Sequence, residues 1–357
     1  MSDRRRFLRR VPIAAVLDER DLIDSGHWFC ATQGSQKSIA YCKAHDIQLV
    51  RAQNESSNTS GGFLAPVQFE ASVFALRELR GAFRATAAYQ PMSRDALFVP
   101  RRTSGLTAYF TNEASAISES MAGWDALQLV ARKLATLTKV SSELDEDAAF
   151  FLGLYLAVEA AYAFALVEDN CGFMGDGSST YDKIRGVIPQ LLDGTHNAGK
   201  ISAAAGHNTF AAIDSSDLCS LIGAVPAVAL PGAKWICSQY AYAITLCRLA
   251  ATSGGIVVMP NEAGRLVPHF MGFPVVVCQS LPQVNTSLSG NVMLLFGDMK
   301  LAATLGERRG ITLARSEHGQ SFAEDNVLYK ITQRIDISVH DLGDNTTAGP
   351  VVGLIGG

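Results

Sequence analysis

The chain has 357 residues, of which 48% are hydrophobic and 18% charged, and its 30 basic and 34 acidic side chains give a formal net charge of −4. This length predicts about two domains, and the apolar content predicts a sizeable core. Because the charged fraction is below the roughly 25% of ordinary soluble domains, we expect much of the surface to be covered by partners. The near-neutral balance excludes bulk coating of nucleic acid and a highly charged disordered chain.

The seven cysteines are odd in number and include no CxxC pair. Several lie in apolar runs, which is typical of buried thiols in a reducing compartment rather than of a disulfide framework. The first ten residues contain five arginines, but no apolar stretch of signal-peptide length follows them. We therefore expect no secretion signal.

The first half of the chain predicts short helices and then a ribbon. Two helical segments are expected over 21–32 and 35–45, and residues 53–62 form a polar linker that is the clearest boundary in the sequence. Strand-forming residues then predict a long two-stranded ribbon, with one strand at 97–99 and the other at 127–140.

An apolar segment of 20 residues, 148–167, follows the ribbon, and Glu159 is its only charged residue. By length it could span a bilayer. Its flanks are acidic on both sides, whereas a membrane span is expected to have Lys or Arg on its cytoplasmic side. We therefore interpret it as a long helix buried against other protein surfaces, with Ser142 as a plausible cap and its end near Cys171.

The second half predicts alternating short elements. A Gly-rich turn is expected at 175–177, a helix after Asp214, a buried strand over 274–278, and a long strand over 327–339.

Candidate catalytic motifs are missing from the sequence. It contains no GxSxG, HExxH, Walker or GxGxxG pattern. The one constellation that could hold a metal is an HxxC pair followed by a CxxH pair, formed by His27, Cys30, Cys42 and His45. Imidazole and thiolate ligands in two such pairs suit tetrahedral zinc. In the interpretation that we favour, the cysteines are apolar contacts of a helical hairpin, and we predict no metal and no cofactor.

Eight short sequence stretches, taken in their order along the chain, are similar to those of a known protein family. They are 60–66 (SGGFLAP), 97–101 (LFVPR), 133–144 (beginning KLA and ending VSSEL), 146–147 (ED), 173–177 (FMGDG), 271–275 (MGFPV), 296–298 with 309–311 (FGD and RGI), and 322–336. Together they resemble the major capsid proteins of tailed double-stranded DNA bacteriophages, over about residues 60–340. The apolar 148–167 segment agrees with this, since a shell subunit must bury more surface than a monomer.

The resemblance implies an α+β, Hong Kong-type phage capsid fold with an N-terminal arm, an extended β-ribbon loop, a peripheral domain with a long spine helix, and an axial domain. The implied division is an arm and linker over 1–60, the start of the peripheral domain over 61–88, the extended loop over 89–135, the peripheral domain with the spine helix over 136–217, the axial domain over 218–312, and a return to the peripheral domain with a C-terminal tail over 313–357.

The function that the resemblance implies is structural. A major capsid protein assembles with itself into the pentamers and hexamers of an icosahedral shell around phage double-stranded DNA, with a portal at one vertex and with possible scaffolding and decoration proteins. It catalyses no reaction, contacts no membrane, is assembled in the bacterial host cytoplasm and ends in the virion. The alternatives are an encapsulin-type nanocompartment shell, which shares the fold, and an enzyme that uses the His/Cys set.

The same resemblance suggests which residues contact neighbouring subunits. Charge pairs between subunits are expected at Arg94, Arg101, Arg102, Glu143, Asp145, Glu146 and Asp147. The basic start, Arg4, Arg5, Arg6, Arg9 and Arg10, is expected to contact a neighbour or the inner shell surface.

Some shells of this kind are locked by isopeptide bonds between a loop Lys and a neighbouring Asn, helped by a Glu. Residues 89–132 contain no Lys, and Thr332 and Gln333 stand near the expected Glu position. We therefore expect a shell without crosslinks.

Overall fold

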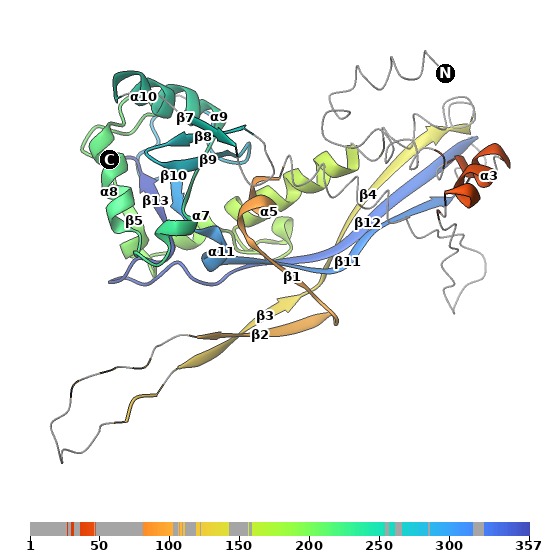
Figure 1. Ribbon diagram of the computed structural model, residues 1–357, viewed down its shortest axis with the longest axis horizontal. Coiled ribbons are helices and arrows are strands. Elements are labelled where there is room, and N and C mark those ends of the chain that lie inside the picture. The colour runs from red at the N-terminus through yellow and green to blue at the C-terminus, as the bar shows by residue number, and fades with distance from the viewer. Residues whose placement is uncertain are drawn as a thin grey trace.

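The computed structural model describes residues 27, 30–31, 36–45, 47, 81–102, 106, 108, 110, 119–121, 123–142, 156, 159–253, 257–260, 266–284, 286–316 and 325–357. Two sheets and a projecting ribbon organise these residues, as Figure 1 shows. The chain passes between the two sheets more than once, so that each is built from segments far apart in the sequence.

A four-stranded sheet forms an elongated arm of the molecule (Figure 1). Its strand order is β1-β11-β12-β4, where β1 runs parallel to β11 and the other neighbours are antiparallel. The strands are β1 (Ala88–Pro91), β4 (Arg132–Ser141), β11 (Ala303–Ser316) and β12 (Asn326–Val339). Every odd-numbered residue of β12 is buried, so one face of this sheet is directed to the core and the other is the outer face.

A seven-stranded sheet forms the centre of the compact part of the molecule, with the order β5-β13-β10-β6-β9-β8-β7. The strands β10 and β13 are buried along their whole length, because both faces of the sheet are covered. Two clusters cover them, one around Phe173 and Leu191 and the other around Phe210 and Trp235. The strands are β5 (Lys200–Ser202), β6 (Lys234–Cys237), β7 (Val257–Pro260), β8 (Leu266–Phe270), β9 (Phe273–Val277), β10 (Val292–Gly297) and β13 (Val351–Ile355).

Most of the short helices lie around this sheet, whereas α3 (Gln36–Ala44) lies at the far end of the arm (Figure 1). A longer helix over 159–169 continues into the π-helical turn η2 (Asn170–Met174). The helix α8 (Ser215–Ala224) begins at Asp214, whose carboxylate accepts hydrogen bonds from two backbone N–H groups of the first turn, as expected for an N-cap. The others are α5 (Ala82–Thr86), η3 (Ser179–Tyr181), α7 (Val187–Leu191), η4 (Asn197–Gly199), η5 (Leu230–Gly232), α9 (Gln239–Ala241), η6 (Tyr242–Cys247), α10 (Arg248–Ser253) and α11 (Met299–Ala302).

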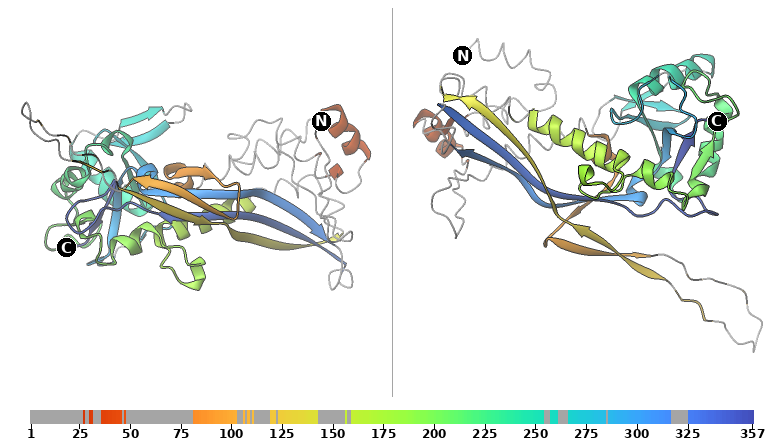
Figure 2. Two further views of the ribbon diagram at one scale, coloured as in Figure 1. Left: turned by 90° about the horizontal axis from the view of Figure 1, so that it is seen from below. Right: turned by 180° about the vertical axis from the view of Figure 1, so that it is seen from behind.

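The ribbon consists of β2 (Ala96–Arg102) and β3 (Trp124–Val130), which pair antiparallel over their full length. Figures 1 and 2 show it projecting away from both sheets. The predicted ribbon is thus confirmed, but the single strand predicted over 127–140 is wrong. The strand is interrupted at Ala131, because β3 pairs with β2 whereas β4 pairs with β12.

Other predictions fare differently. The helix predicted over 35–45 is confirmed by α3, the helix after Asp214 by α8, and the long strand over 327–339 by β12. The strand at 274–278 forms as β9, but it is not buried as predicted, since Val277 is exposed. The first half of the apolar segment 148–167 lies mostly outside the described residues.

The strands β11 and β13 do not follow the predicted domain boundaries. The boundary at 312 falls inside β11, which lies in the four-stranded sheet from Ala303 onward. The C-terminal strand β13, predicted as part of a return to the peripheral domain and a tail, instead pairs with β10 and β5 inside the seven-stranded sheet. The ladder hydrogen bonds and the apolar side chains of β13 are satisfied only there.

Candidate functional site

The ribbon exposes apolar side chains. Trp124 is 68% exposed and Phe98 is 62% exposed, and Leu106, Phe110 and Met121 beyond the two strands are also exposed. A two-stranded ribbon is marginally stable by itself in water. Exposed apolar surface of this extent marks a site of contact with another protein surface. The ribbon is therefore the first candidate surface for assembly.

Polar contacts anchor the base of the ribbon to the four-stranded sheet. The carboxylate of Asp336 accepts hydrogen bonds from the backbone N–H of Val130 at 2.7 Å and from Nε of Arg132 at 3.1 Å. Burial raises the pKa of Asp336, and these two hydrogen bonds oppose the rise. On the outer face of the sheet, Nη1 of Arg334 in β12 lies 2.9 Å from Oδ1 of Asp95. The ribbon is thus held in one orientation by charged groups.

Apolar contacts support the same base. Met92, Leu129 and Ala131 form a small buried cluster against the outer face of the sheet. Gly306 of β11 lies beneath it, and a Cβ there would stand 2.8 Å from Sδ of Met92. The ribbon approaches the sheet this closely because residue 306 has no side chain.

On the opposite, core-directed side of this sheet, four side chains form a buried polar network. Arg84 binds Glu168 with two hydrogen bonds, from Nε at 3.0 Å and from Nη2 at 3.1 Å. Nη1 of Arg84 binds Glu307 at 3.2 Å, and Nε2 of Gln333 donates to the same carboxylate. The side chains of Arg84 and Glu168 are 5% and 0% exposed. This network joins α5, the 159–169 helix and two strands of the sheet.

Asp169 makes a second buried link between the 159–169 helix and α5. Its carboxylate accepts the backbone N–H groups of Ala82 at 3.1 Å and Phe83 at 2.7 Å, at the start of α5. Burial raises the pKa of Asp169 to about 6, although these hydrogen bonds and one from Cys278 act in the other direction. Glu168 and Asp169, the acidic residues that follow the apolar segment, are both buried.

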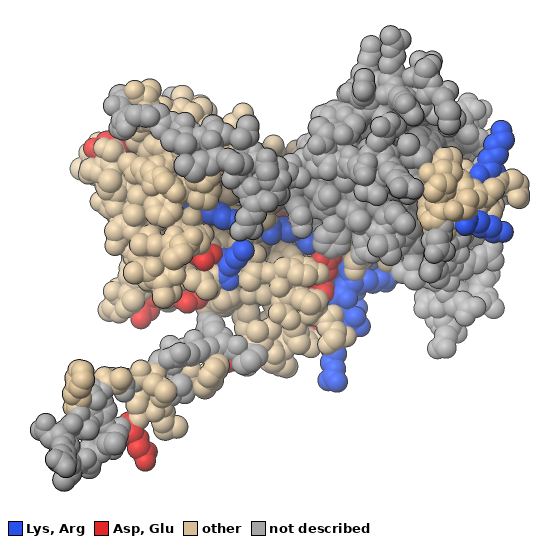
Figure 3. Space-filling view, in the orientation of Figure 1, with Lys and Arg blue, Asp and Glu red and all other residues tan. Residues whose placement is uncertain are grey.

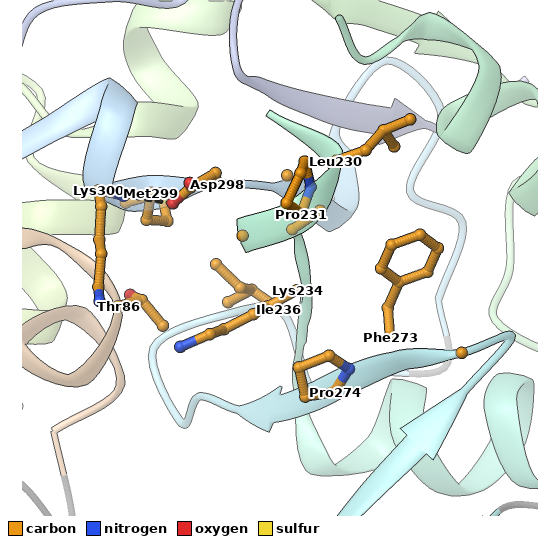
Figure 4. Close-up of a pocket in the computed structure, with 14 residues that line it drawn as sticks. Thr86, Leu230, Pro231, Lys234, Ile236, Phe273, Pro274, Asp298, Met299 and Lys300 are labelled. Carbon is orange, nitrogen blue, oxygen red and sulfur yellow. Dashed lines mark hydrogen bonds between the residues drawn. The ribbon is translucent and has the colours of Figure 1, made fainter. Parts of the chain in front are cut away.

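A hollow of about 670 Å³ lies between the seven-stranded sheet and α5 (Figure 4). Lys234 and Lys300 lie in its wall, with Asp298 at the start of α11. Burial, and secondarily the charge of Lys300, lowers the pKa of Lys234. The lining residues include no His, Cys or Ser, and the hydroxyl of Thr86 donates a hydrogen bond to the backbone carbonyl of Ala82 at 2.7 Å.

The predicted charge-pair residues are only partly within the described chain. Arg94 is exposed at the turn between β1 and β2, and Arg101 and Arg102 lie at the end of β2. The remaining predicted contact residues lie outside the described residues; they are Glu143, Asp145, Glu146, Asp147, Arg4, Arg5, Arg6, Arg9 and Arg10. The sequence reading missed the described contacts made by Asp95 and Asp336, which depend on strand pairing over long sequence distances.

The candidate zinc ligands are not brought together as a set in the described part of the chain. Tyr41 stacks with His27 at a centroid distance of 3.8 Å and with His45 at 4.0 Å. Two rings stack on Tyr41 at such distances only from opposite faces, which separates the two imidazoles. Cys42 is buried and Cys30 is partly buried.

A different group of potential ligand atoms, His207, Asp214 and Asp217, lies within 4.8 Å in the described residues. It is explained by capping of α8. Asp217 accepts the backbone N–H groups of Ala204 at 2.9 Å and Asp214 at 3.1 Å, and its Oδ2 lies 2.6 Å from Nδ1 of His207. Burial alone would raise the pKa of Asp217, but these hydrogen bonds hold it below its ordinary value.

These features define a structural subunit of the α+β capsid class, with an exposed ribbon and no described catalytic set. The sequence profile of the Phage capsid family matches residues 61–342, and the chain belongs to this family. It is therefore a phage capsid protein, and this family is structural rather than catalytic. No curated protein matches the chain.

Solved structures agree with the fold. The capsid of an empty GTA particle shares 22% identity over 77% of this chain and 89% of that chain, with a TM-score of 0.58. A chain from Mycobacterium phage Adephagia shares 15% identity over 89% of this chain and 97% of that chain, with a TM-score of 0.54. One from Gordonia phage Cozz shares 15% identity over 78% and 87%, with a TM-score of 0.52.

The membrane interpretation of the apolar segment finds no support in the described helices. None of them combines the length and the apolar character that a bilayer span requires.

Proposed function

We propose that copies of this chain form the pentamers and hexamers of an icosahedral shell that encloses phage double-stranded DNA, with a portal at one vertex. The observation that carries the proposal is the ribbon, which holds apolar side chains such as Trp124 and Phe98 outside the body of the subunit. In a shell these side chains are covered by neighbouring copies, which removes apolar surface from water.

In this proposal the part of the subunit around the seven-stranded sheet is the axial domain, and the arm with the four-stranded sheet is the peripheral domain. Axial domains meet around the five-fold and six-fold positions, and the ribbons lie across neighbouring subunits. Scaffolding and decoration proteins are further candidate partners. Arg94, Arg101 and Arg102 remain proposed contact residues between subunits.

We also propose that the shell is held without isopeptide crosslinks. Only a neutral amine attacks an amide, and the guanidinium of Arg stays protonated. Between Lys43 and Lys133 the chain has no Lys, so the ribbon supplies no amine. An acid does lie beside Gln333, namely Glu307 from the next strand, but its carboxylate is buried and bound to Arg84. It is engaged within the subunit.

Three measurements on purified particles test the proposal. Electron microscopy should show closed icosahedral shells, and nuclease-treated particles should retain double-stranded DNA. Boiling in denaturant should release a monomer near 38.1 kDa. Protein cargo without DNA would indicate an encapsulin-type compartment instead. A ladder of covalent oligomers that resists reductant would contradict the absence of crosslinks.

A further inference from the structure

Two lysines face the hollow between the seven-stranded sheet and α5. Lys234 is the first residue of β6, and Lys300 lies in α11. Figure 4 shows both side chains extended into the hollow, with their ammonium groups on the side where Thr86 of α5 lies. Burial is the larger cause of the lowered pKa of Lys234, and the charge of Lys300 adds to it. The two ammonium groups are therefore close enough to repel each other.

The described chain does not neutralise this pair of cations. Neither lysine side chain forms a salt bridge or a hydrogen bond with any residue that the structure describes. Asp298 is the only acid among the described lining residues. Its Oδ1 accepts the backbone N–H of Lys300 at 2.9 Å, and its Oδ2 lies against the backbone of Gly232. One carboxylate against two ammonium groups leaves the hollow with a net positive charge.

The rest of the wall is largely apolar. Pro231, Pro274 and Phe273 lie around the side chain of Lys234 (Figure 4). The two prolines have a fixed φ, and the ring of Phe273 packs edge-on against Phe296 at a centroid distance of 5.0 Å. A largely apolar, preformed wall with a few polar groups is typical of sites for small molecules, which span roughly 300–1,000 Å³. The hollow, at about 670 Å³, lies within that range.

The two parts of the wall favour one chemical class of ligand. An inorganic anion would pair with the lysines, but it would leave the apolar side chains against water. A neutral apolar molecule would cover those side chains and take the ammonium groups out of water without a partner, which is costly. A molecule that joins a ring or an aliphatic chain to a carboxylate or another oxyanion satisfies both parts.

We propose that the hollow binds a small organic anion, with its anionic group at the ammonium groups of Lys234 and Lys300 and its apolar body against Phe273, Pro231 and Pro274. The inference goes beyond the proposed function, because one subunit forms the whole site and binding requires no assembly. The walls of the hollow come from the seven-stranded sheet and from α5, so a bound molecule would contact both. Since it binds the folded subunit, it would also stabilise the fold.

Three probes test the inference by isothermal titration calorimetry on the full-length, unassembled subunit. The first, 1-naphthoate, carries both an apolar ring and a carboxylate. The second, 1-naphthalenemethanol, has the same ring without the charge, and the third, acetate, has the charge without the ring. We expect 1-naphthoate to bind about tenfold or more tightly than either of the others, because charge-assisted hydrogen bonds and ring contacts then act together.

Substitutions locate the binding. Lys234→Met and Lys300→Met each remove one ammonium group and keep an apolar side chain, and each should weaken the binding of 1-naphthoate by about tenfold. The affinity for 1-naphthalenemethanol should stay unchanged. Lys330→Met removes the same charge from β12, outside the hollow, and should bind 1-naphthoate as the wild type does. Circular dichroism should show the same folding for every variant, and if half-buried Lys234→Met fails to fold, the exposed Lys300→Met carries the test.

Four outcomes would overturn the inference. The first is no binding of 1-naphthoate by the wild type at the solubility limit of the probe. The second is equal affinity for 1-naphthoate and 1-naphthalenemethanol, because the lysines would then contribute nothing. The third is unchanged binding by folded Lys234→Met and Lys300→Met, which would place the probe elsewhere, for example on the exposed apolar side chains of the ribbon. The fourth is an equal loss in Lys330→Met. None of these results concerns shell assembly, so the proposed function stands or fails by its own measurements.

Discussion

The two faces of the four-stranded sheet differ in whether their charged side chains are buried and paired within the subunit. On the core-directed face, Glu307 and Gln333 are buried. The carboxylate of Glu307 binds Arg84 and accepts a hydrogen bond from Nε2 of Gln333, so its charge is paired within the subunit. On the outer face, Arg309 and Lys330 are exposed and have no described counter-charge. The core-directed face stabilises a single copy, whereas we expect the outer face to take part in contacts between copies. Substitutions on the two faces should therefore change different measurements.

Figure 3 shows how the outer charges are distributed. Lys and Arg side chains are visible on the described part of the central region, and Asp and Glu side chains lie beside several of them.

The largest effect is expected on the core-directed face. Arg84→Met removes the cation that binds two buried carboxylates, Glu168 and Glu307. Breaking a buried charge pair by removing one partner costs about 3 to 5 kcal/mol. We expect the free energy of unfolding of the unassembled subunit to fall by this amount, as measured by denaturant titration.

A matched variant isolates the electrostatic cause. Adding Glu168→Gln and Glu307→Gln to Arg84→Met leaves amides in place of the carboxylates that Arg84 bound. This triple variant should be more stable than Arg84→Met alone. Equal stability of Arg84→Met and the wild type would show that the network contributes nothing.

The next effect depends on pH. Because burial raises the pKa of Asp169 to about 6, above its ordinary value of 3.8, the folded subunit binds a proton more tightly than the unfolded chain. The stability from this group is present at low pH and is lost as the pH rises through 6. Asp169→Asn cannot titrate, so wild type should gain about 2 kcal/mol relative to this variant between pH 7 and pH 4.5. Urea titrations at the two pH values measure this, and an unchanged difference would contradict it.

Part of this structure is readable from the sequence. Alternation of buried and polar residues predicts β12, and Asp214 before an apolar run predicts α8. The two faces are not readable in the same way. Glu168 is buried because Arg84, 84 residues away in sequence, reaches it. Likewise, Arg309 and Arg334 stand side by side on the outer face only because the strand register places them opposite each other. Both depend on pairing that local patterns do not contain.

The predicted surface residues show the same limit. The resemblance suggests Arg94 as a contact residue, and this stays a prediction, whereas its neighbour Asp95 has the described contacts with Arg334 and Arg308. Sequence reasoning can find exposed cations in a loop, but it cannot tell which of the adjacent charges faces a partner.

A smaller effect is expected for the ion pairs of Asp95 on the outer face. Asp95 is 66% exposed and lies 2.9 Å from Arg334 and 3.5 Å from Arg308. Exposed ion pairs contribute about 0 to 1 kcal/mol, so Asp95→Ala should lower the stability of the subunit by no more than that. The loss should shrink in about 1 M salt, where the screening length is about 3 Å. Thermal unfolding at low and high salt checks this, and a loss that persists in high salt would argue for a packing role instead.

The smallest change in the stability of the subunit is expected for a substitution in the ribbon. There an exposed tryptophan can be compared directly with a buried one. Trp124→Ser replaces a side chain that is 68% exposed, so the free energy of unfolding should change by less than about 0.5 kcal/mol. Trp235→Ser is the matched control, since Trp235 is 1% exposed, donates a hydrogen bond to the carbonyl of Phe270 and packs against Phe296. Loss of a buried Trp costs about 3 to 5 kcal/mol even for a change to Ala.

The two tryptophan variants should therefore separate folding from assembly. Trp235→Ser should lower the yield of soluble subunit, whereas Trp124→Ser should give normal soluble subunit and few particles, because its apolar surface is covered only in the shell. Sedimentation of the assembly mixture measures the particles, and denaturant titration measures the subunit. Normal particle yield from Trp124→Ser would show that the exposed ring is not part of an interface, and the role of the ribbon would then rest on its other exposed apolar residues, Phe98 and Phe110 among them.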